Sequence, residues 1–166
     1  FHYLKEALKR LSQEHTEWNG KLGVVLIGKN IDATLYNDIP FDVYPLRYIA
    51  EEKRLADIYN AVDLFAIPSL QDNLPNTIVE AMACGVPCIG FNVGGIPEMI
   101  DHLHNGYIAE YKNIGDFAAG IHWLLTEGEY DLLSHEAARK AANTYGENSV
   151  AMKYIGIYNR ITGKNE

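Results

Sequence analysis

Short apolar runs alternate with helix-like segments along this sequence, and this alternation narrows the possible folds more than any other feature. The run LGVVLIG at Leu22–Gly28 is rich in β-branched residues and bounded by glycine, which is typical of a parallel strand covered on both faces. Leu4, Leu8 and Leu11 recur at helical spacing between charged residues, which predicts an amphipathic helix over Phe1–Glu14. Strands that alternate with helices imply right-handed crossovers. The sequence therefore predicts an α/β fold with a Rossmann-like, doubly wound parallel sheet.

The other elements follow from the same patterns and from the positions of glycine and proline. Pro45 is expected at the edge or end of its strand, because proline has no N–H to donate to a sheet. Gly85 is expected to end a helix. Further strands are predicted at Phe41–Leu46, Asp63–Ile67, Pro87–Phe91 and Tyr107–Ala109, a helix or loop at Asp32–Asp38, and helices at Glu51–Asn60, Asn76–Ala83, Pro97–His102, Ile114–Glu127, Asp131–Thr144 and Asn148–Ile161.

The length of 166 residues and the 48% hydrophobic content fit one domain with its own core. No apolar run approaches the roughly 20 residues that cross a bilayer. The sequence starts at Phe1 instead of a methionine, and no capping residue precedes the first helix. We therefore expect residues 1–166 to form a single domain truncated at its N-terminus, most simply by a strand that would pair beside Leu22–Gly28.

Charge and composition exclude several kinds of function. A net charge of −8, from 22 acidic and 14 basic residues, argues against a broad nucleic-acid surface. It leaves room for one small anionic ligand at a helix N-terminus. Cys84 and Cys88 are expected to be small buried residues, not a disulfide or a metal pair. His102 and His104 are expected at the surface, because nothing nearby completes a ligand set, so no metal and no cofactor are predicted.

Ligands of doubly wound sheets bind beyond the carboxyl ends of the strands, a rule that selects four loops. One of them leads into a helix, where unpaired N–H groups favour a phosphate, although every helix has such an end. Asn73 or Asn76 would cap that helix or face a ligand. The four loops are Gly28–Asn30, Leu46–Tyr48, Ser69–Asn76 and Asn92–Ile96.

Three features of these loops each allow a functional and a structural interpretation. Glu80 lies on an otherwise apolar helix, and its two oxygens match the vicinal hydroxyls of a ribose, but its spacing from Thr77 also fits a capping box. Asp72 could contact a ligand or stabilise a turn. Gly94 and Gly95 either let the backbone approach a ligand closely or form a plain strand-to-helix turn.

The stretch from Leu55 to Glu110, with its segments LFAIPS, VEAMACGVPCIGF and VGGIPE, resembles the donor-binding half of retaining, two-domain glycosyltransferases of the family-4 type. The match extends from about Leu22 to the closing helix. It implies the C-terminal half of a GT-B fold, in which two Rossmann-like domains face a cleft and this half holds the sugar nucleotide. Two departures stand out: Asp72 replaces the usual glutamate, and Asn73-Leu74-Pro75 replaces a Gly-x-Gly. The diphosphate-binding Arg and Lys of the family fall outside the chain.

The resemblance also implies roles for individual residues. Glu80 would contact the donor ribose and Asp72 the hydroxyls of the transferred sugar, and these two are the expected catalytic positions. The other expected substrate-binding residues are Asn73, Leu74, Asn76 and Thr77 at the sugar and diphosphate, Gly28, Lys29, Leu46 and Arg47 around the base, and Gly94 and Gly95.

The resulting hypothesis is a retaining enzyme that transfers a sugar from a nucleotide-diphosphate sugar to an envelope glycan or lipid-linked acceptor held by the missing domain. UDP-sugar is the preferred candidate for the donor and GDP-sugar the second. The hypothesis implies a cytoplasmic enzyme, at the inner face of the membrane in some relatives, that needs no metal and is inactive as this fragment. Tyr154 and Tyr158 on the last helix are expected to promote self-association. Two alternatives stay open: a sugar-nucleotide epimerase on the same fold, for which no acid/base pair is found, and a non-catalytic nucleotide-binding module.

Overall fold

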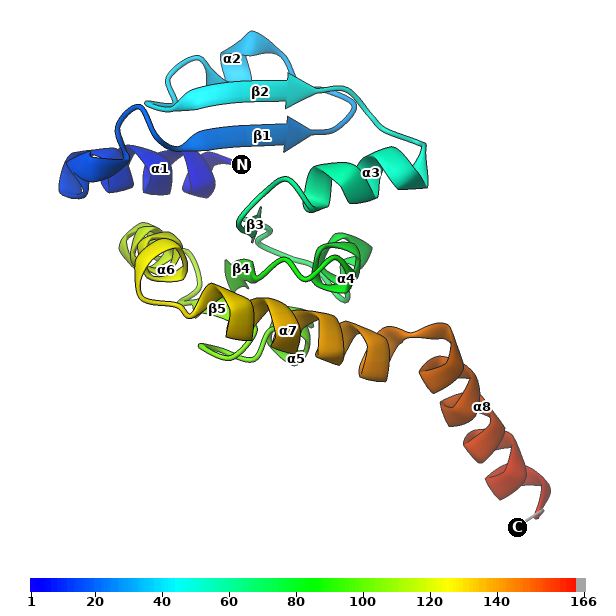
Figure 1. Cartoon of the computed structure of the whole chain (residues 1–166). Helices are drawn as coiled ribbons and strands as arrows, with labels where there is room; N and C mark the ends of the chain where they lie inside the picture. The colour runs from blue at the N-terminus through cyan, green and yellow to red at the C-terminus, as the bar shows by residue number, and fades with distance from the viewer. Residues whose placement is uncertain (164–166) are drawn as a thin grey trace.

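The structure is a computed structural model that describes residues 1–163 (Figure 1). It is an α/β fold in which all paired strands are parallel. The helices are α1 (His2–Glu14), α2 (Ala33–Tyr36), α3 (Glu52–Tyr59), α4 (Asn76–Ala83), α5 (Ile96–Met99), α6 (Ile114–Thr126), α7 (Tyr130–Lys140) and α8 (Glu147–Thr162), with a short 3-10 helix at Thr16–Trp18 and a π-helix at Ala141–Tyr145.

The strands form two separate sheets, whereas the sequence predicted one. β1 (Gly23–Ile27) pairs with β2 (Asp42–Leu46), and β4 (Cys88–Phe91) lies between β3 (Phe65–Ile67) and β5 (Gly106–Ala109). β1 lies on the side of its sheet that faces β3, but no ladder joins the two strands (Figure 1). The predicted Rossmann-like arrangement of parallel strands and helices is thus confirmed, while its sheet is split in the part of the chain that the structure describes.

β4 is the central strand of the larger sheet, and all four of its residues are buried. Ile89 and Phe91 point into a core shared with α1 and α6, and the Phe91 ring lies 4.8 Å from that of Phe117. Cys88 points to the other face, into a core shared with α4, α5 and α7. Burial on both faces fixes the register of this strand, and with it the positions of the loops at its carboxyl end.

The β1–β2 sheet is less covered than the sequence predicted. Ile27 is 39% exposed, because this two-stranded sheet packs on the body mainly through residues such as Val24 and Val43, which join the core around Phe91. Pro45 lies within β2, opposite Leu26, and is tolerated because β2 is an edge strand.

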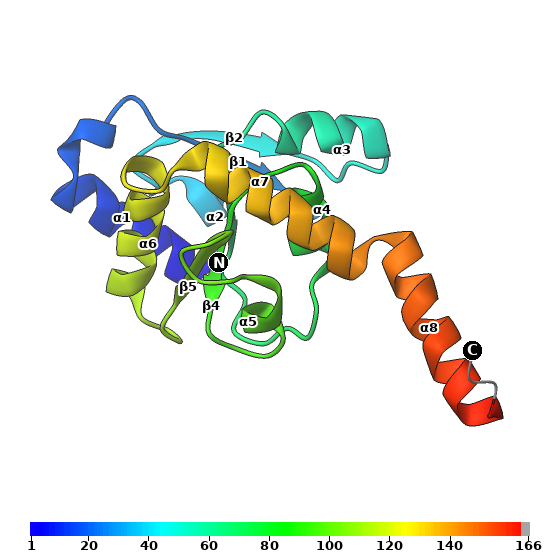
Figure 2. The same cartoon turned by 60° about the horizontal axis from the view of Figure 1, so that its bottom comes forward.

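α8 stands apart from the body in both views (Figures 1 and 2). None of its described residues is buried, and Met152, Tyr158 and Ile161 are 67%, 61% and 76% exposed. Among residues 1–163, no helix has both the length and the apolar character needed to span a bilayer. The helix therefore presents an apolar surface without contributing to the core.

Removing residues 151–166 is expected to change the free energy of unfolding by less than about 0.5 kcal/mol, because α8 buries nothing. The control is Phe117→Ala in the core, which should cost about 3–5 kcal/mol. Urea unfolding followed by circular dichroism measures both. A truncated chain as unstable as the Phe117 variant would contradict this account of α8.

Candidate functional site

The loop between β3 and α4 leaves the carboxyl end of β3 and enters α4 through Pro75, the N-cap residue. The Ile78 N–H donates to the Pro75 carbonyl at 3.0 Å, while Asn76 and Thr77 are exposed at the start of the helix. No side chain caps α4. Among the described residues, neither Asn73 nor Asn76 caps α4, and the N–H groups of Asn76 and Thr77 in its first turn have no hydrogen-bond partner.

The capping-box interpretation of Thr77 and Glu80 is wrong. Thr77 lies inside α4, two residues after the N-cap residue Pro75. Glu80 instead accepts a hydrogen bond at Oε2 from the Tyr59 hydroxyl, at 3.2 Å, across the contact between α3 and α4. The Glu80 side chain is half-buried and the Tyr59 side chain is only 5% exposed. Glu80 is thus held by a buried donor close to the open end of α4.

Tyr59 is a site residue that sequence reasoning missed. Burial raises the pKa of its hydroxyl, and the neighbouring Glu80 carboxylate raises it further, so the group stays a hydrogen-bond donor. One signal was available: a tyrosine ends the amphipathic helix that precedes the strand leading to the Asp72 loop.

Gly94 and Gly95 contact the protein's own backbone at this site. The Gly95 N–H donates to the Asp72 carbonyl at 3.2 Å. A Cβ on Gly95 would lie 1.7 Å from the Asn73 carbonyl oxygen, and one on Gly94 would lie 1.8 Å from that of Asp72. Gly94 also has a φ of +57°, in the left-handed region that glycine tolerates best. The close approach that the structure shows is to the protein's own β3–α4 loop, and the predicted approach to a ligand stays a prediction.

A second contact supports the same loop. The Tyr111 hydroxyl, after β5, donates to the Leu70 carbonyl at 3.3 Å. Loops that follow β3, β4 and β5 thus meet at one edge of the sheet. The predicted residues gathered there are Asp72, Asn73, Leu74, Asn76, Thr77, Glu80, Gly94 and Gly95.

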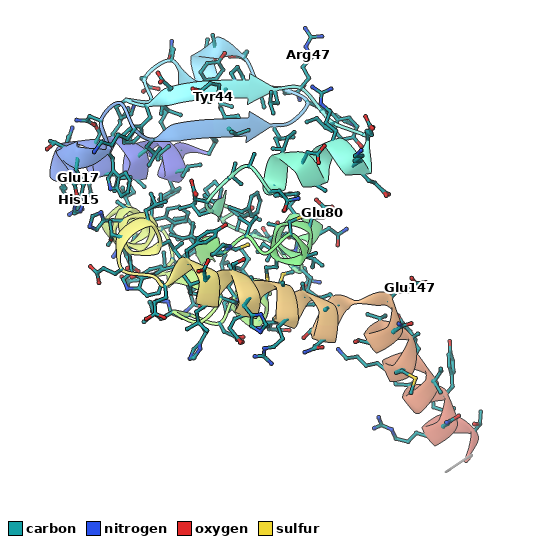
Figure 3. The ribbon with its side chains drawn as sticks, viewed as in Figure 1. His15, Glu17, Tyr44, Arg47, Glu80 and Glu147 are labelled. Atoms are coloured by element: carbon teal, nitrogen blue, oxygen red, sulfur yellow. The ribbon has the colours of Figure 1, made fainter. Side chains whose placement is uncertain are left out.

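The remaining predicted residues line a separate hollow at the carboxyl ends of β1 and β2. Its volume is about 670 Å³. The Lys29 ammonium lies 4.7 Å from the centre of the Tyr48 ring, a cation–π contact, and Arg47 projects outward beyond β2 (Figure 3). Within residues 1–163, no hydrogen bond joins the residues that line this hollow to Glu80 or to the loop residues gathered near it. Its lining comprises Gly28, Lys29, Ile31, Tyr36, Pro45, Leu46, Arg47 and Tyr48.

Three side chains of the kinds that bind metal ions lie close together away from the candidate site, between the end of α1 and α6. One ligand atom from each of His15, Glu17 and His122 lies within 4.8 Å of the others. The two imidazole rings are stacked 3.6 Å apart and nearly parallel, at 16°, and the Trp18 indole N–H donates to Nδ1 of His122. Parallel rings direct their nitrogen lone pairs side by side instead of toward one point. The arrangement fits packing between two helices better than metal coordination.

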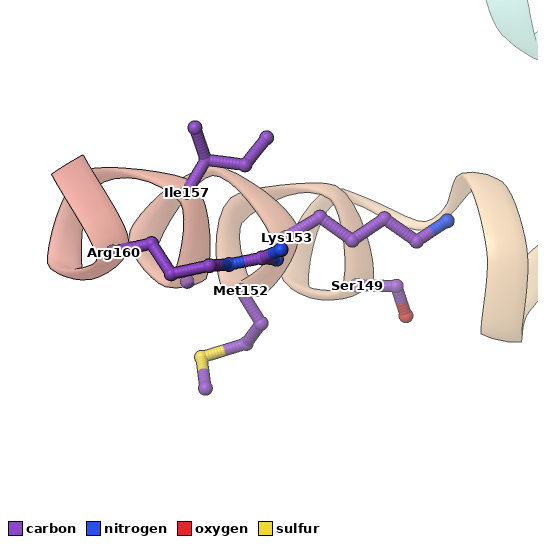
Figure 4. A pocket seen from close by; sticks show the side chains of 6 residues that line it. Ser149, Met152, Lys153, Ile157 and Arg160 are labelled. Atoms are coloured by element: carbon purple, nitrogen blue, oxygen red, sulfur yellow. The ribbon is translucent and has the colours of Figure 1, made fainter. Parts of the chain in front are cut away.

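The structure also shows where the histidine and cysteine residues singled out in the sequence lie. His102, on the surface, accepts a hydrogen bond from the Ile108 N–H at 3.1 Å. Cys88 is fully buried, Cys84 is half-buried, and both are free thiols. A shallow hollow on α8, lined by Ser149, Met152, Lys153, Gly156, Ile157 and Arg160, belongs to a single exposed helix (Figure 4).

Two curated proteins are similar to most of this chain. A protein named uncharacterized glycosyltransferase from Haemophilus influenzae is 27% identical over 164 residues, which is 95% of this chain and 44% of that protein. The N,N'-diacetylbacillosaminyl-diphospho-undecaprenol alpha-1,3-N-acetylgalactosaminyltransferase of Campylobacter jejuni is 25% identical over 94% of this chain and 42% of its own length. The chain thus spans less than half the length of these relatives.

A solved structure shares the fold. The pneumococcal O-GlcNAc transferase crystallised with UDP and GlcNAc superposes with a TM-score of 0.72 at 19% identity, over 95% of this chain and 32% of that one. This likeness confirms the predicted half of a GT-B fold. The sequence profile described as "Glycosyl transferases group 1" matches residues 1–127 of the 166. The resemblance inferred from the motifs is therefore confirmed, and this chain belongs to the glycosyl transferases group 1 family.

Proposed function

We propose that this chain is the donor-binding domain of a retaining glycosyltransferase and binds a UDP-sugar at the edge of the sheet where the β3–α4 and β4–α5 loops meet. The observation that carries the proposal is the open N-terminus of α4 beside the half-buried Glu80 carboxylate. Unpaired N–H groups favour the diphosphate, and a carboxylate accepts the ribose hydroxyls. Family membership and the UDP in the pneumococcal structure support this assignment.

The rest of the donor is assigned by position. Asp72, on the loop that Gly95 holds, would contact the hydroxyls of the transferred sugar. The base would enter the hollow lined by Gly28, Lys29, Leu46 and Arg47, where the Tyr48 ring offers a face for stacking. UDP-sugar is our first choice of donor and GDP-sugar the second.

The acceptor would be a glycan or a lipid-linked sugar bound by a second domain outside this chain. The length of the relatives supports a two-domain enzyme, because they are more than twice as long as the matched region. The name of the Campylobacter enzyme describes a diphospho-undecaprenol-linked substrate, which supports a cytoplasmic enzyme working at the inner face of the membrane. The isolated chain would then bind donor without transferring sugar.

The first prediction concerns nucleotide binding. In calorimetric titrations, the chain should bind UDP more tightly than GDP or ADP, and Glu80→Gln should weaken UDP binding about tenfold or more, because hydrogen bonds to a charged acceptor are lost. Glu98→Gln, an exposed carboxylate of α5, is the control and should bind normally. UDP affinity that is equal in both variants would refute the assignment of Glu80.

The second prediction concerns the glycine pair. Gly95→Ala should abolish detectable UDP binding and cost about 1–3 kcal/mol of stability, because its Cβ would collide with the Asn73 carbonyl and push the loop away. The matched control is Gly156→Ala on α8, where a Cβ meets nothing within 4 Å and alanine favours the helix. If Gly95→Ala binds UDP as well as the control does, the loop contact is not needed for the site.

The third prediction concerns α8. We propose that its apolar side chains cause self-association of the isolated chain, since Tyr154, Ile157 and Tyr158 are 57%, 46% and 61% exposed. Sedimentation equilibrium should show a dimer or larger species that Ile157→Lys shifts toward monomer. Thr162→Lys adds the same charge to the same helix outside the apolar set and should leave the assembly intact. If the wild-type chain is still monomeric at about 100 μM, a concentration far above the dissociation constant of a stable dimer, the proposal is wrong.

A further inference from the structure

We propose that Tyr59 is a positioning residue of the donor site: its hydroxyl holds one oxygen of the Glu80 carboxylate and leaves the other free to accept the hydroxyl groups of the nucleotide's ribose. The inference rests on the function proposed above, because the ribose contact of Glu80 belongs to that function. No residue of α3 had been connected with the site by sequence pattern or by resemblance.

The Tyr59 ring has a fixed position. It ends α3 with 5% exposure and packs edge-to-face on Phe65, with ring centres 5.8 Å apart at 76°. From this position its hydroxyl reaches Oε2 of Glu80 at 3.2 Å and the Thr77 carbonyl at 3.5 Å. A hydroxyl has one proton, and the shorter contact to the charged acceptor is the stronger of the two. The α3–α4 contact thus determines where the Glu80 carboxylate lies.

The second carboxylate oxygen is left for a ligand. Within residues 1–163, Tyr59 supplies the one protein hydrogen bond to the Glu80 side chain, at Oε2. The other oxygen, Oε1, accepts no hydrogen bond from the described residues and is not buried, so it keeps its lone pairs for a ligand. A carboxylate already fixed in one rotamer loses less conformational entropy on binding than a free one. Tyr59 would therefore act on affinity through Glu80, without touching the nucleotide.

Tyr59 acts as a donor and not as a base. Burial raises the pKa of the Tyr59 hydroxyl, and the Glu80 carboxylate raises it further, so the proton stays on the phenol at neutral pH. Phenylalanine would preserve the ring contact with Phe65 and remove the donor alone. This makes Tyr59→Phe a clean test that should leave the fold intact, as thermal unfolding can verify.

The matched control is Tyr107→Phe. The Tyr107 hydroxyl, on β5, donates to Oδ1 of Asp116 at the start of α6, at 2.8 Å. This variant also removes a tyrosine-to-carboxylate hydrogen bond from a partly buried pair, but on elements that do not carry Glu80. Any general effect of losing such a bond should appear equally in both variants.

The first measurement needs no nucleotide. The chain is labelled with ¹³C at the glutamate side-chain carboxyl groups, and the Glu80 signal is assigned through Glu80→Gln. Tyr59→Phe should shift that signal, because the bonded oxygen loses its donor, while Tyr107→Phe should leave it in place. An unchanged Glu80 signal in Tyr59→Phe would overturn the proposal, since it would mean that the hydroxyl is satisfied by the Thr77 carbonyl instead.

The second measurement compares UDP with 2′,3′-dideoxy-UDP, which lacks both ribose hydroxyls. Tyr59→Phe should weaken UDP binding about five- to tenfold, because Glu80 is no longer held in place although it can still accept the ribose hydroxyls, and it should leave the weaker dideoxy ligand unaffected. Equal losses for both ligands, or no loss for UDP, would overturn the proposal. If the wild-type chain binds neither ligand, the proposed function fails, and the Glu80 carboxyl signal alone then decides whether Tyr59 holds Glu80.

Discussion

Complete burial of β4 is the constraint on which the body of this molecule depends. Ile89 and Phe91 on one face and Cys88 on the other separate the two cores, and α1, α4, α6 and α7 pack around them. A strand buried on both faces cannot slip by one residue without turning a core side chain into the opposite core. The loop that follows Phe91 therefore leaves the sheet at a fixed point, and this point is where the candidate site forms.

The site is built by contacts between loops instead of by one motif. Gly95 donates its N–H to the Asp72 carbonyl, so the loop after β4 shapes the loop after β3. The β3–α4 loop in turn exposes the first N–H groups of α4 beside Glu80, which Tyr59 holds from α3. Each element thus contributes a backbone contact or a side chain that positions the next. The chemistry that results, open amides beside a held carboxylate, is suited to an anionic ligand with hydroxyl groups.

Much of this could be predicted from sequence, and the misses have physical causes. The strands and the helices follow from periodicity, and family motifs indicate the candidate residues of α4, since both signals are local in the chain. The Tyr59–Glu80 bond joins residues 21 positions apart, and no local pattern encodes such a contact. The capping box failed because Pro75 occupies the N-cap and places Thr77 inside α4. The split sheet was missed because alternation predicts strand direction but not which strands share a ladder.

Amide chemical-shift mapping of the ¹⁵N-labelled chain during addition of UDP shows whether the open end of α4 binds a nucleoside diphosphate. We expect the largest shifts at the amides of Asn76, Thr77 and Gly95, with a second group around Lys29 at the hollow beyond β1. Shifts concentrated elsewhere, for example along α8 or around His122, would mean that UDP does not bind at the open end of α4.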